Sequence, residues 1–239
     1  MKWIFPSTEP KLISQIQDEF RVSKIIAKVM ATRGLASSEQ TTPFFNPDIS
    51  LLHDPFLMKN MEKAVERIIN AIKSHQPIMI FGDYDVDGTT AASLLFIGLK
   101  NLGAEVSTYI PNRETEGYGL SELGIDTAKK RGAKLMITCD CGMNDVEHVE
   151  YATANDIEVI ITDHHTPGEM LPNAIAVLNP KQSDCNYPFK ELCGGGVALK
   201  LLTGLVKELN LPFDLVYDLF DLAALGTSAD LVPMIDENR

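Results

Sequence analysis

From about residue 77 onward, short apolar runs alternate with longer amphipathic stretches. The apolar runs predict strands at about 77–82, 105–110, 134–138, 157–162 and 174–178. The amphipathic stretches predict helices near 88–101, 121–131, 144–154 and 196–209. Alternation of this kind is typical of a parallel sheet with helices on both faces. We therefore expect an α/β fold built on a parallel five-stranded sheet.

The chain before the first strand has a helical pattern. Residues 61–73, MEKAVERIINAIK, form a strongly amphipathic helix pattern. Earlier, apolar residues recur at near-helical spacing from Lys11 to Arg33, Gly34 is suited to ending a helix, and a second short helix is expected near Ser38. These patterns predict a helical N-terminal segment over 1–60 and a larger domain over 61–239.

Composition narrows the class of protein. The chain has 239 residues, of which 45% are hydrophobic, enough to build a core. Its apolar stretches are far shorter than the roughly 20 residues that cross a bilayer, and the opening MKWIFPSTEP has no apolar signal core. The four cysteines, at 139, 141, 185 and 193, are too few and too irregular for a disulfide scaffold, so we expect packing roles and a reducing, cytoplasmic setting.

The charge is acidic, with 33 Asp and Glu against 21 Lys and Arg and a net charge of −12. A protein that binds nucleic acid over its whole surface normally has a basic footprint, so this balance argues against passive binding. It leaves room for a nucleic-acid enzyme whose acidic residues hold cations. A solvated helix face is the preferred explanation for the more basic first 40 residues.

Three carboxylates follow the first predicted strand in FGDYDVDGTTA. Asp83, Asp85 and Asp87 are spaced by two, and Gly88 then begins a helix pattern. Carboxylates this close repel one another unless a cation lies among them, and divalent ions with oxygen ligands are the usual solution. A calcium EF-hand is excluded because its twelfth position requires Glu, and Leu94 stands there.

Other chemistry-bearing residues lie at the ends of later elements. Asp140 follows the third strand in CDCG, and Asp163, His164 and His165 follow the fourth in TDHHTPG. Asp230 comes after an expected turn of small residues in LGTSADLVP. The carboxyl ends of parallel strands share one edge of a sheet, so we expect these side chains to converge there.

Carboxylates and imidazole without cysteine suit Mn²⁺ or Mg²⁺ better than a structural zinc. Six carboxylates and a histidine exceed the needs of one ion. Two ions about 3.5–4 Å apart are suited to in-line attack at phosphorus. The pattern therefore predicts phosphoester hydrolysis with two Mn²⁺ or Mg²⁺ ions.

Two further segments are candidates for substrate binding. Gly194, Gly195 and Gly196 precede a predicted helix, so their amides could receive a phosphate, or they could form a tight turn. The loop after the second strand carries residues suited to a nucleotide. Its guanidinium could contact a phosphate and its aromatic ring could stack on a base or pack the loop; the residues are Arg113, Tyr118 and Ser121.

The motifs DYDVDG, CDCG, DHH and GTSADLVP, in this order, resemble the four motifs of the DHH phosphoesterase superfamily. The surrounding segments HDPF, IPNR, EGYGLS, VLNPK and CNYPFKELCGGGVA resemble the RecJ family of bacterial exonucleases within it. This resemblance implies a metal-dependent phosphodiesterase that degrades single-stranded DNA from 5′ to 3′ in repair and recombination. It also implies a helicase or a single-strand-binding protein as a partner.

The resemblance also implies roles for individual residues. His165 would face the scissile phosphate, and Asp140 would bridge the two ions, with Asp163 as a further catalytic position that ligates or orients its neighbour. The implied metal ligands are Asp83, Asp85, Asp87, Asp140, Asp163, His164 and Asp230.

Members of that family normally continue beyond the fourth motif into further domains, and nothing after Asp230 has that character. We therefore expect a catalytic half that binds metal but processes single-stranded DNA weakly. Two alternatives stay open. One is a DHH hydrolase of short oligonucleotides, cyclic dinucleotides or polyphosphate. The other is a non-catalytic replication partner, which is disfavoured because every motif position is filled.

Overall fold

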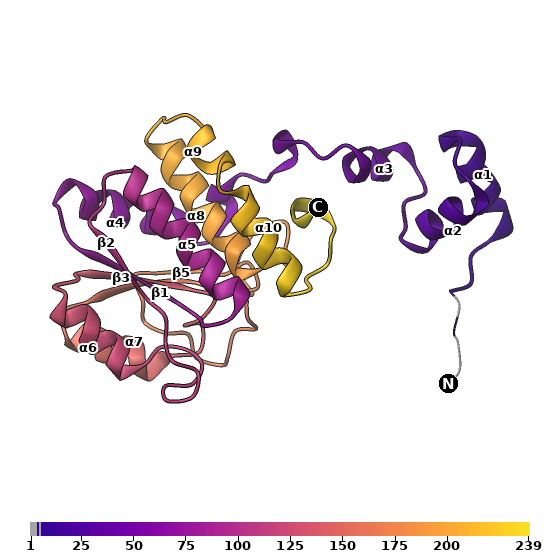
Figure 1. Cartoon of the computed structure of the whole chain (residues 1–239). Helices are drawn as coiled ribbons and strands as arrows, with labels where there is room; N and C mark the ends of the chain where they lie inside the picture. The colour runs from indigo at the N-terminus through magenta and orange to yellow at the C-terminus, as the bar shows by residue number, and fades with distance from the viewer. Residues whose placement is uncertain (1–3, 5) are drawn as a thin grey trace. The chain divides into compact units, whose positions relative to one another are not determined.

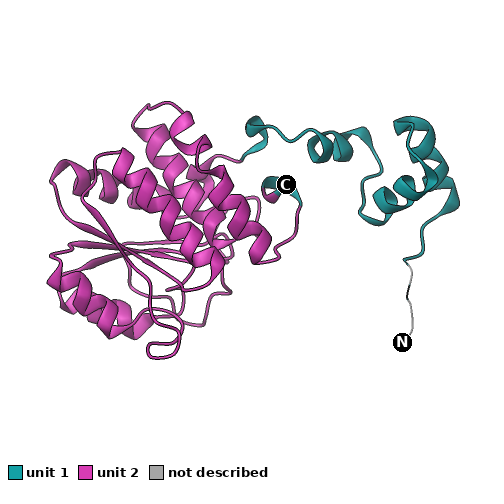
Figure 2. Ribbon diagram, viewed as in Figure 1, with its two compact units in different colours: residues 1–52, 235–237, 239 teal, residues 53–234, 238 magenta. Residues whose placement is uncertain are grey.

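The computed structural model describes residue 4 and residues 6–239. Residues 1–3 and 5, which belong to the stretch without a signal core, lie outside the described residues. The chain divides into two compact units (Figure 2), one of residues 1–52, 235–237 and 239 and the other of residues 53–234 and 238. This division falls earlier than the expected boundary at residue 60.

The boundary lies earlier because the segment before residue 61 is bonded to the larger unit. Lys200 Nζ donates to the carbonyl of His53 at 3.0 Å. Lys207 pairs with Asp54 at 2.6 Å, and a further ion pair joins Lys59 to Asp184. The short helix η2 (Pro55–Leu57) therefore belongs with the domain that follows it.

The smaller unit contains α1 (Pro10–Phe20), α2 (Lys24–Thr32), α3 (Ser38–Phe45) and η1 (Ile49–Leu51). The helical pattern from Lys11 to Arg33 is divided between α1 and α2. The expectation of one continuous helix over this range is therefore wrong. Arg21 has a left-handed φ of 52°, and Ser23 caps α2 by accepting from the amide of Ile26. The break lets the apolar faces of both helices share one small core, formed by Ile13, Ile16, Ala27 and Met30.

The larger unit is built on a sheet of five parallel strands, which confirms the predicted fold class (Figure 1). The strands are β1 (Ile78–Gly82), β2 (Val106–Tyr109), β3 (Leu135–Cys139), β4 (Glu158–Thr162) and β5 (Ala176–Leu178). Their order is β2-β1-β3-β4-β5. The order reverses between β1 and β3, and ligands of such sheets bind outside the carboxyl ends of the strands at this point.

Alternate strand residues supply two cores. Ile78 and Ile80 face a core shared with α4 (Met61–Lys73), α5 (Val86–Asn101) and α8 (Gly194–Glu208). Met79 and Phe81 face a second core shared with α6 (Glu122–Lys130) and α7 (Val146–Ala154) on the other side of the sheet (Figure 1). The two-residue period of each strand thus explains why the strands are apolar throughout.

Two helices after α8 were not expected. They are α9 (Asp214–Tyr217) and α10 (Phe220–Ala229), and η3 (Asp236–Asn238) follows. The expected turn of small residues before Asp230 is in fact the end of α10. Gly226 packs against Asp87 and Thr90 of α5, so the small residue serves helix packing rather than a turn.

The four cysteines are free and buried, as expected for packing residues. Within the described part of the chain, no helix is both long enough and apolar enough to span a membrane.

Candidate functional site

Three aspartates each follow the last residue of a strand. They are Asp83 after β1, Asp140 after β3 and Asp163 after β4, and all three are buried. The amide of each donates to the last carbonyl of the neighbouring strand, on Cys139 at 3.1 Å, Thr162 at 2.9 Å and Leu178 at 3.0 Å respectively. The register of the sheet therefore fixes the backbone positions from which these carboxylates extend.

The start of α5 adds two more carboxylates. Asp85 caps the helix, with Oδ1 accepting from the amide of Gly88 at 2.8 Å. Asp87 lies in the first turn, is buried, and accepts from the amides of Gly194 at 2.5 Å and Gly195 at 2.8 Å. The first turn of α8 thus holds Asp87 in place.

The glycine triplet was expected either to receive a phosphate or to form a tight turn. The structure shows a third arrangement, in which two of its amides donate to Asp87 and that of Gly196 donates to Cys193 Sγ. Glycine is required at position 194, since a Cβ there would lie 2.6 Å from Cβ of Asp140. The triplet therefore acts on the site through a carboxylate.

His164 lies among these carboxylates. Its Nε2 is 3.1 Å from Oδ1 of Asp140, 3.6 Å from Oδ2 of Asp230 and 3.9 Å from Oδ2 of Asp87. Asp230 reaches this position as the C-cap of α10. Residues from β1, α5, β3, β4 and α10 are thus brought to one edge of the sheet, as the motifs predicted.

Four polar atoms at this edge are buried without a hydrogen-bond partner among the described residues: Oδ1 of Asp83, Oδ1 of Asp140 and both ring nitrogens of His164. Each such atom costs about 1–3 kcal/mol. Burial, with the charges of Asp87 and Asp85, raises the pKa of Asp140 to about 10. Asp140 also has a left-handed φ of 63°, which is uncommon outside glycine. The protein alone leaves this cluster unsatisfied.

A divalent cation fits the cluster. Three groups each bring their ligand atoms within 4.8 Å of one another: Asp83, Asp85 and Asp140; Asp87, His164 and Asp230; and Asp140, His164 and His165. Carboxylate oxygens and imidazole are donors for Mn²⁺ and Mg²⁺. Asp140 belongs to two groups, so neighbouring ions could share it. The four unpartnered atoms belong to Asp83, Asp140 and His164, which are all members of these groups, and a cation would complete this arrangement.

Asp163 has a different environment. Its Oδ1 accepts from Nδ1 of His165 at 2.8 Å and from the amides of His164 and His165, and its Oδ2 accepts from the amide of Met143 at 2.9 Å. Burial alone would raise the pKa of Asp163, but the bonds from His165 outweigh it and hold the pKa below its ordinary value. Asp163 lies in none of the three ligand groups, so the geometry favours orienting over ligating.

His165 is therefore held with one ring nitrogen engaged. An ionised Asp163 can only accept, so Nδ1 carries the proton of their hydrogen bond. That bond raises the pKa of His165. The hydroxyl of Tyr118 donates to the carbonyl of Asp140 at 3.1 Å, and its oxygen faces Nδ1 at 3.0 Å. The second ring nitrogen, Nε2, is left to act on a ligand, and the side chain is 42% exposed.

Asn179 supports the site although it was not among the predicted site residues. Its side chain is fully buried and donates to the carbonyl of His165 at 2.8 Å, while its Oδ1 accepts from the amide of Lys181. The sequence signal for this role is a side-chain amide that directly follows the apolar strand β5, in the segment VLNPK. Asn179 thus supports the backbone that carries His165.

The other loop candidates differ from one another. Arg113 is exposed, with its guanidinium 5.2 Å from the ring centre of Tyr84. Ser121 is buried and caps α6, accepting from the amide of Gly124 at 3.0 Å and donating to Glu116 at 2.5 Å. Its hydroxyl therefore has hydrogen-bond partners within the loop and α6, and a contact with substrate stays a prediction.

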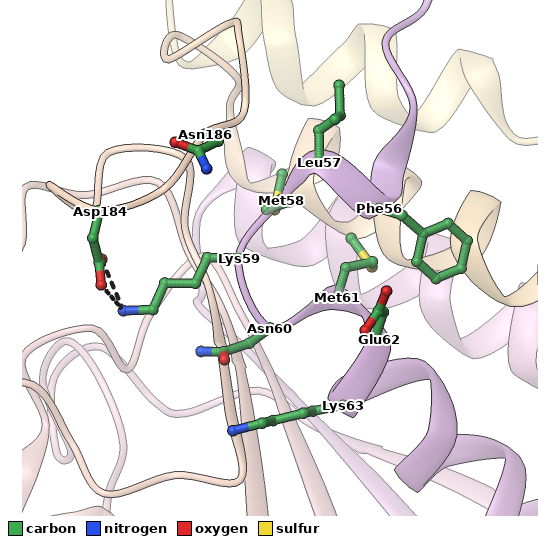
Figure 3. A pocket seen from close by; sticks show the side chains of 10 residues that line it. All are labelled: Phe56, Leu57, Met58, Lys59, Asn60, Met61, Glu62, Lys63, Asp184 and Asn186. Atoms are coloured by element: carbon green, nitrogen blue, oxygen red, sulfur yellow. Dashed lines mark hydrogen bonds and ion pairs between the residues drawn. The ribbon is translucent and has the colours of Figure 1, made fainter.

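A separate cavity of about 370 Å³ lies around the turn from η2 into α4 (Figure 3). The ion pair between Lys59 and Asp184 forms part of its wall. Its lining residues are Phe56 to Lys63, Asp184 and Asn186. It shares no residue with the cluster at the strand ends.

The model of the DHH family, N-terminal domain, matches residues 77–227. This chain belongs to the DHH family. The matched range contains β1 to β5 and every predicted ligand except Asp230.

Within the family, similar proteins are single-stranded-DNA-specific exonucleases. The chain is 41% identical over 239 residues to the exonuclease RecJ of Bacillus subtilis (strain 168), of whose length it spans 30%. Two similar solved structures are those of RecJ from Thermus thermophilus in complex with Mn²⁺ and with Mg²⁺. The first is 31% identical with a TM-score of 0.78 over 98% of this chain and 33% of that chain. The second is 28% identical with a TM-score of 0.67 over 98% of this chain and 29% of that chain.

Proposed function

We propose that this chain forms the metal-binding, catalytic part of a 5′ to 3′ exonuclease that hydrolyses phosphodiester bonds of single-stranded DNA with two Mn²⁺ or Mg²⁺ ions. The observation that carries the proposal is the set of four buried, unpartnered atoms on Asp83, Asp140 and His164. The naming of similar proteins as single-stranded-DNA-specific exonucleases supports the substrate class.

In this proposal Asp83, Asp85 and Asp140 hold one ion and Asp87, His164 and Asp230 hold the other; Asp140, which also lies in a ligand group with His164, would contribute to both. Bound divalent ions neutralise phosphate charge and lower the pKa of water for in-line attack. The side chains of Asp163 and His165 would orient the phosphate and transfer a proton. Asp163 fixes the ring of His165, whose Nε2 can contact the phosphate or give a proton to the leaving oxygen.

The loop after β2 supplies candidates for holding the strand. The exposed guanidinium of Arg113 is suited to a phosphate, and the half-exposed ring of Tyr118 is suited to a base. We also propose a reducing, cytoplasmic setting, which the four free cysteines support. A helicase or a single-strand-binding protein as a partner rests on the family resemblance.

The test is a nuclease assay on a 5′-labelled single strand, with the Bacillus subtilis relative setting the scale. We expect Mn²⁺-dependent release of mononucleotides, more slowly than by the longer relative, and none in EDTA. Cleavage that persists in EDTA would contradict the proposal. Faster turnover of a dinucleotide than of the long strand would favour the hydrolase of short oligonucleotides. Absence of Mn²⁺ binding would favour the non-catalytic partner.

A further inference from the structure

The loop of residues 110–121 connects β2 to α6 at the edge of the sheet that carries the site (Figure 1). It is longer than most strand-to-helix connections, which have about 2–6 residues. Loops of this length need side-chain anchors if they are to keep one conformation, because most of their backbone groups have no ladder or helix partner.

One carboxylate ties the beginning of this loop to its end. Oε1 of Glu116 accepts from the amide of Asn112 at 2.8 Å. Its Oε2 accepts from the hydroxyl of Tyr109, the last residue of β2, at 2.7 Å, and from the hydroxyl of Ser121, the N-cap of α6, at 2.5 Å. Glu116 thus bonds the strand, the loop and the helix together.

The ionisation state of Glu116 strengthens the hydrogen bonds by which it anchors the loop. Burial alone would raise the pKa of Glu116, but the three hydrogen bonds outweigh it and hold the pKa below its ordinary value. Burial and the charge of Glu116 raise the pKa of Tyr109 to about 12. At neutral pH the carboxylate is therefore ionised and the phenol remains a donor, so the bonds are charge-assisted.

The part of the loop that follows Glu116 carries Tyr118 to the site. Gly117 and Gly119 flank it with φ values of 83° and 89°, in the region that favours glycine. Two glycines leave the local backbone free to adopt other conformations, so the loop must be held on either side. Leu120 provides the second anchor, with its amide donating to Oδ2 of Asp145 at 2.9 Å.

We propose that Glu116 is a positioning residue, which fixes the loop of residues 110–121 so that the hydroxyl of Tyr118 stays between the carbonyl of Asp140 and Nδ1 of His165. The contact it secures is Tyr118 at 3.0 Å from Nδ1 of His165, with the two rings edge-on at 5.6 Å. This inference rests on the proposed function, because it assigns His165 to the reaction. Without the anchor, the glycine-flanked segment would sample positions in which His165 loses this neighbour.

Glu114 offers a matched control. It has the same charge and lies two residues earlier in the same loop, exposed, and the bond in which it takes part comes from its backbone amide. Glu116→Gln keeps the shape of the side chain but replaces one acceptor oxygen by a donor, so it loses either the bond from the amide of Asn112 or the bonds from the two hydroxyls. Glu114→Gln removes the same charge without touching the anchor.

The first arm of the experiment needs no substrate. The metal-free chain, with its histidines labelled by ¹³C and ¹⁵N, is compared by NMR in the wild type, Glu116→Gln, Tyr118→Phe and Glu114→Gln. We expect the ring signals of His165 to shift in the same direction in the first two variants and to stay unchanged in the third. Unchanged signals in Tyr118→Phe would overturn the proposal even if Glu116→Gln failed to fold.

The second arm measures kinetics with Mn²⁺ and a single strand. Loss of positioning should lower kcat about tenfold in Glu116→Gln and in Tyr118→Phe, with the affinity for Mn²⁺ within about twofold of wild type. Equal kinetics in Glu116→Gln and Glu114→Gln would overturn the proposal, as would a parallel loss of Mn²⁺ affinity. If the wild type itself does not cleave, the proposed function fails, and the NMR arm alone supports or overturns the role of Glu116.

Discussion

The two halves of the site satisfy their polar atoms in opposite ways. Around Asp140, buried oxygen and nitrogen atoms lie close together without hydrogen-bond partners in the described chain. Around Asp163, which follows the neighbouring strand at the same sheet edge, both carboxylate oxygens are engaged by amides and by a histidine ring. The first half is therefore organised for a cation that the protein does not supply, whereas the polar atoms of the second half are satisfied by the protein itself.

The largest expected effect comes from removing the carboxylate that the two ligand groups share. Asp140→Asn should lower the exonuclease rate by at least about 1,000-fold, since it weakens both proposed ion sites at once. The rate of mononucleotide release with Mn²⁺ measures this. Glu114→Gln, a change of the same charge on the exposed loop, serves as control and should leave the rate within about twofold of wild type. A rate for Asp140→Asn close to wild type would remove the distinction between the two halves.

The next effect should come from the satisfied half. His165→Ala removes the ring that Asp163 holds and should lower kcat by about 100- to 1,000-fold, the range expected for loss of a positioned acid or base. Its affinity for Mn²⁺ should change far less than that of Asp140→Asn. Loss of Mn²⁺ binding comparable to that of Asp140→Asn would show that His165 is primarily a metal ligand. The difference between the two halves of the site would then not hold.

A smaller effect is expected from the residue that orients His165. Asp163→Asn keeps the side-chain shape but can accept from Nδ1 through only one oxygen and carries no charge. We expect kcat to fall about 10- to 100-fold, the usual cost of losing an outer partner of a functional histidine. If Asp163 is instead an ion ligand, the Mn²⁺ affinity of the variant will fall in step with kcat. Calorimetry beside the kinetic assay distinguishes these results.

The smallest effect concerns stability without metal. The folded pKa of Asp140, about 10, lies above its unfolded value of 3.8. The proton on Asp140 therefore stabilises the fold at pH values below about 4, and this contribution is lost as the pH rises toward 10. In metal-free buffer at pH 8, Asp140→Asn should then be more stable than wild type by about 1–3 kcal/mol. Denaturant unfolding at pH 5 and pH 8 measures this; equal pH dependence in the two proteins would contradict it.

The sheet, and the meeting of the candidate ligands at one edge of it, were predictable from sequence because their signals are local. Strand ends followed directly by Asp83, Asp140 and Asp163 identify the carboxyl edge, and the parallel arrangement brings these positions together. The break at Arg21 and the helix before Asp230 were missed, since both depend on packing between separate helices. A helical pattern in the sequence does not indicate where the chain turns so that two shorter helices can pack against each other.

The supporting contacts could not be predicted in the same way. The carboxylate of Asp87 accepts from the amides of Gly194 and Gly195, more than 100 residues later in the chain, and no spacing rule connects them. Asn179 and Glu116 act through hydrogen bonds whose partners are fixed only once the loops have been placed. A sequence motif indicates which residues carry the chemistry, whereas the bonds that hold them are a property of the fold.

The unsatisfied half of the site is expected to hold divalent cations. Isothermal titration of the metal-free chain with Mn²⁺ tests it most directly, with Asp140→Asn and Asp163→Asn beside the wild type. We predict two ions per chain in the wild type, loss of binding in Asp140→Asn and retained binding in Asp163→Asn. Absence of binding in the wild type, or binding that Asp140→Asn leaves unchanged, would contradict the claim.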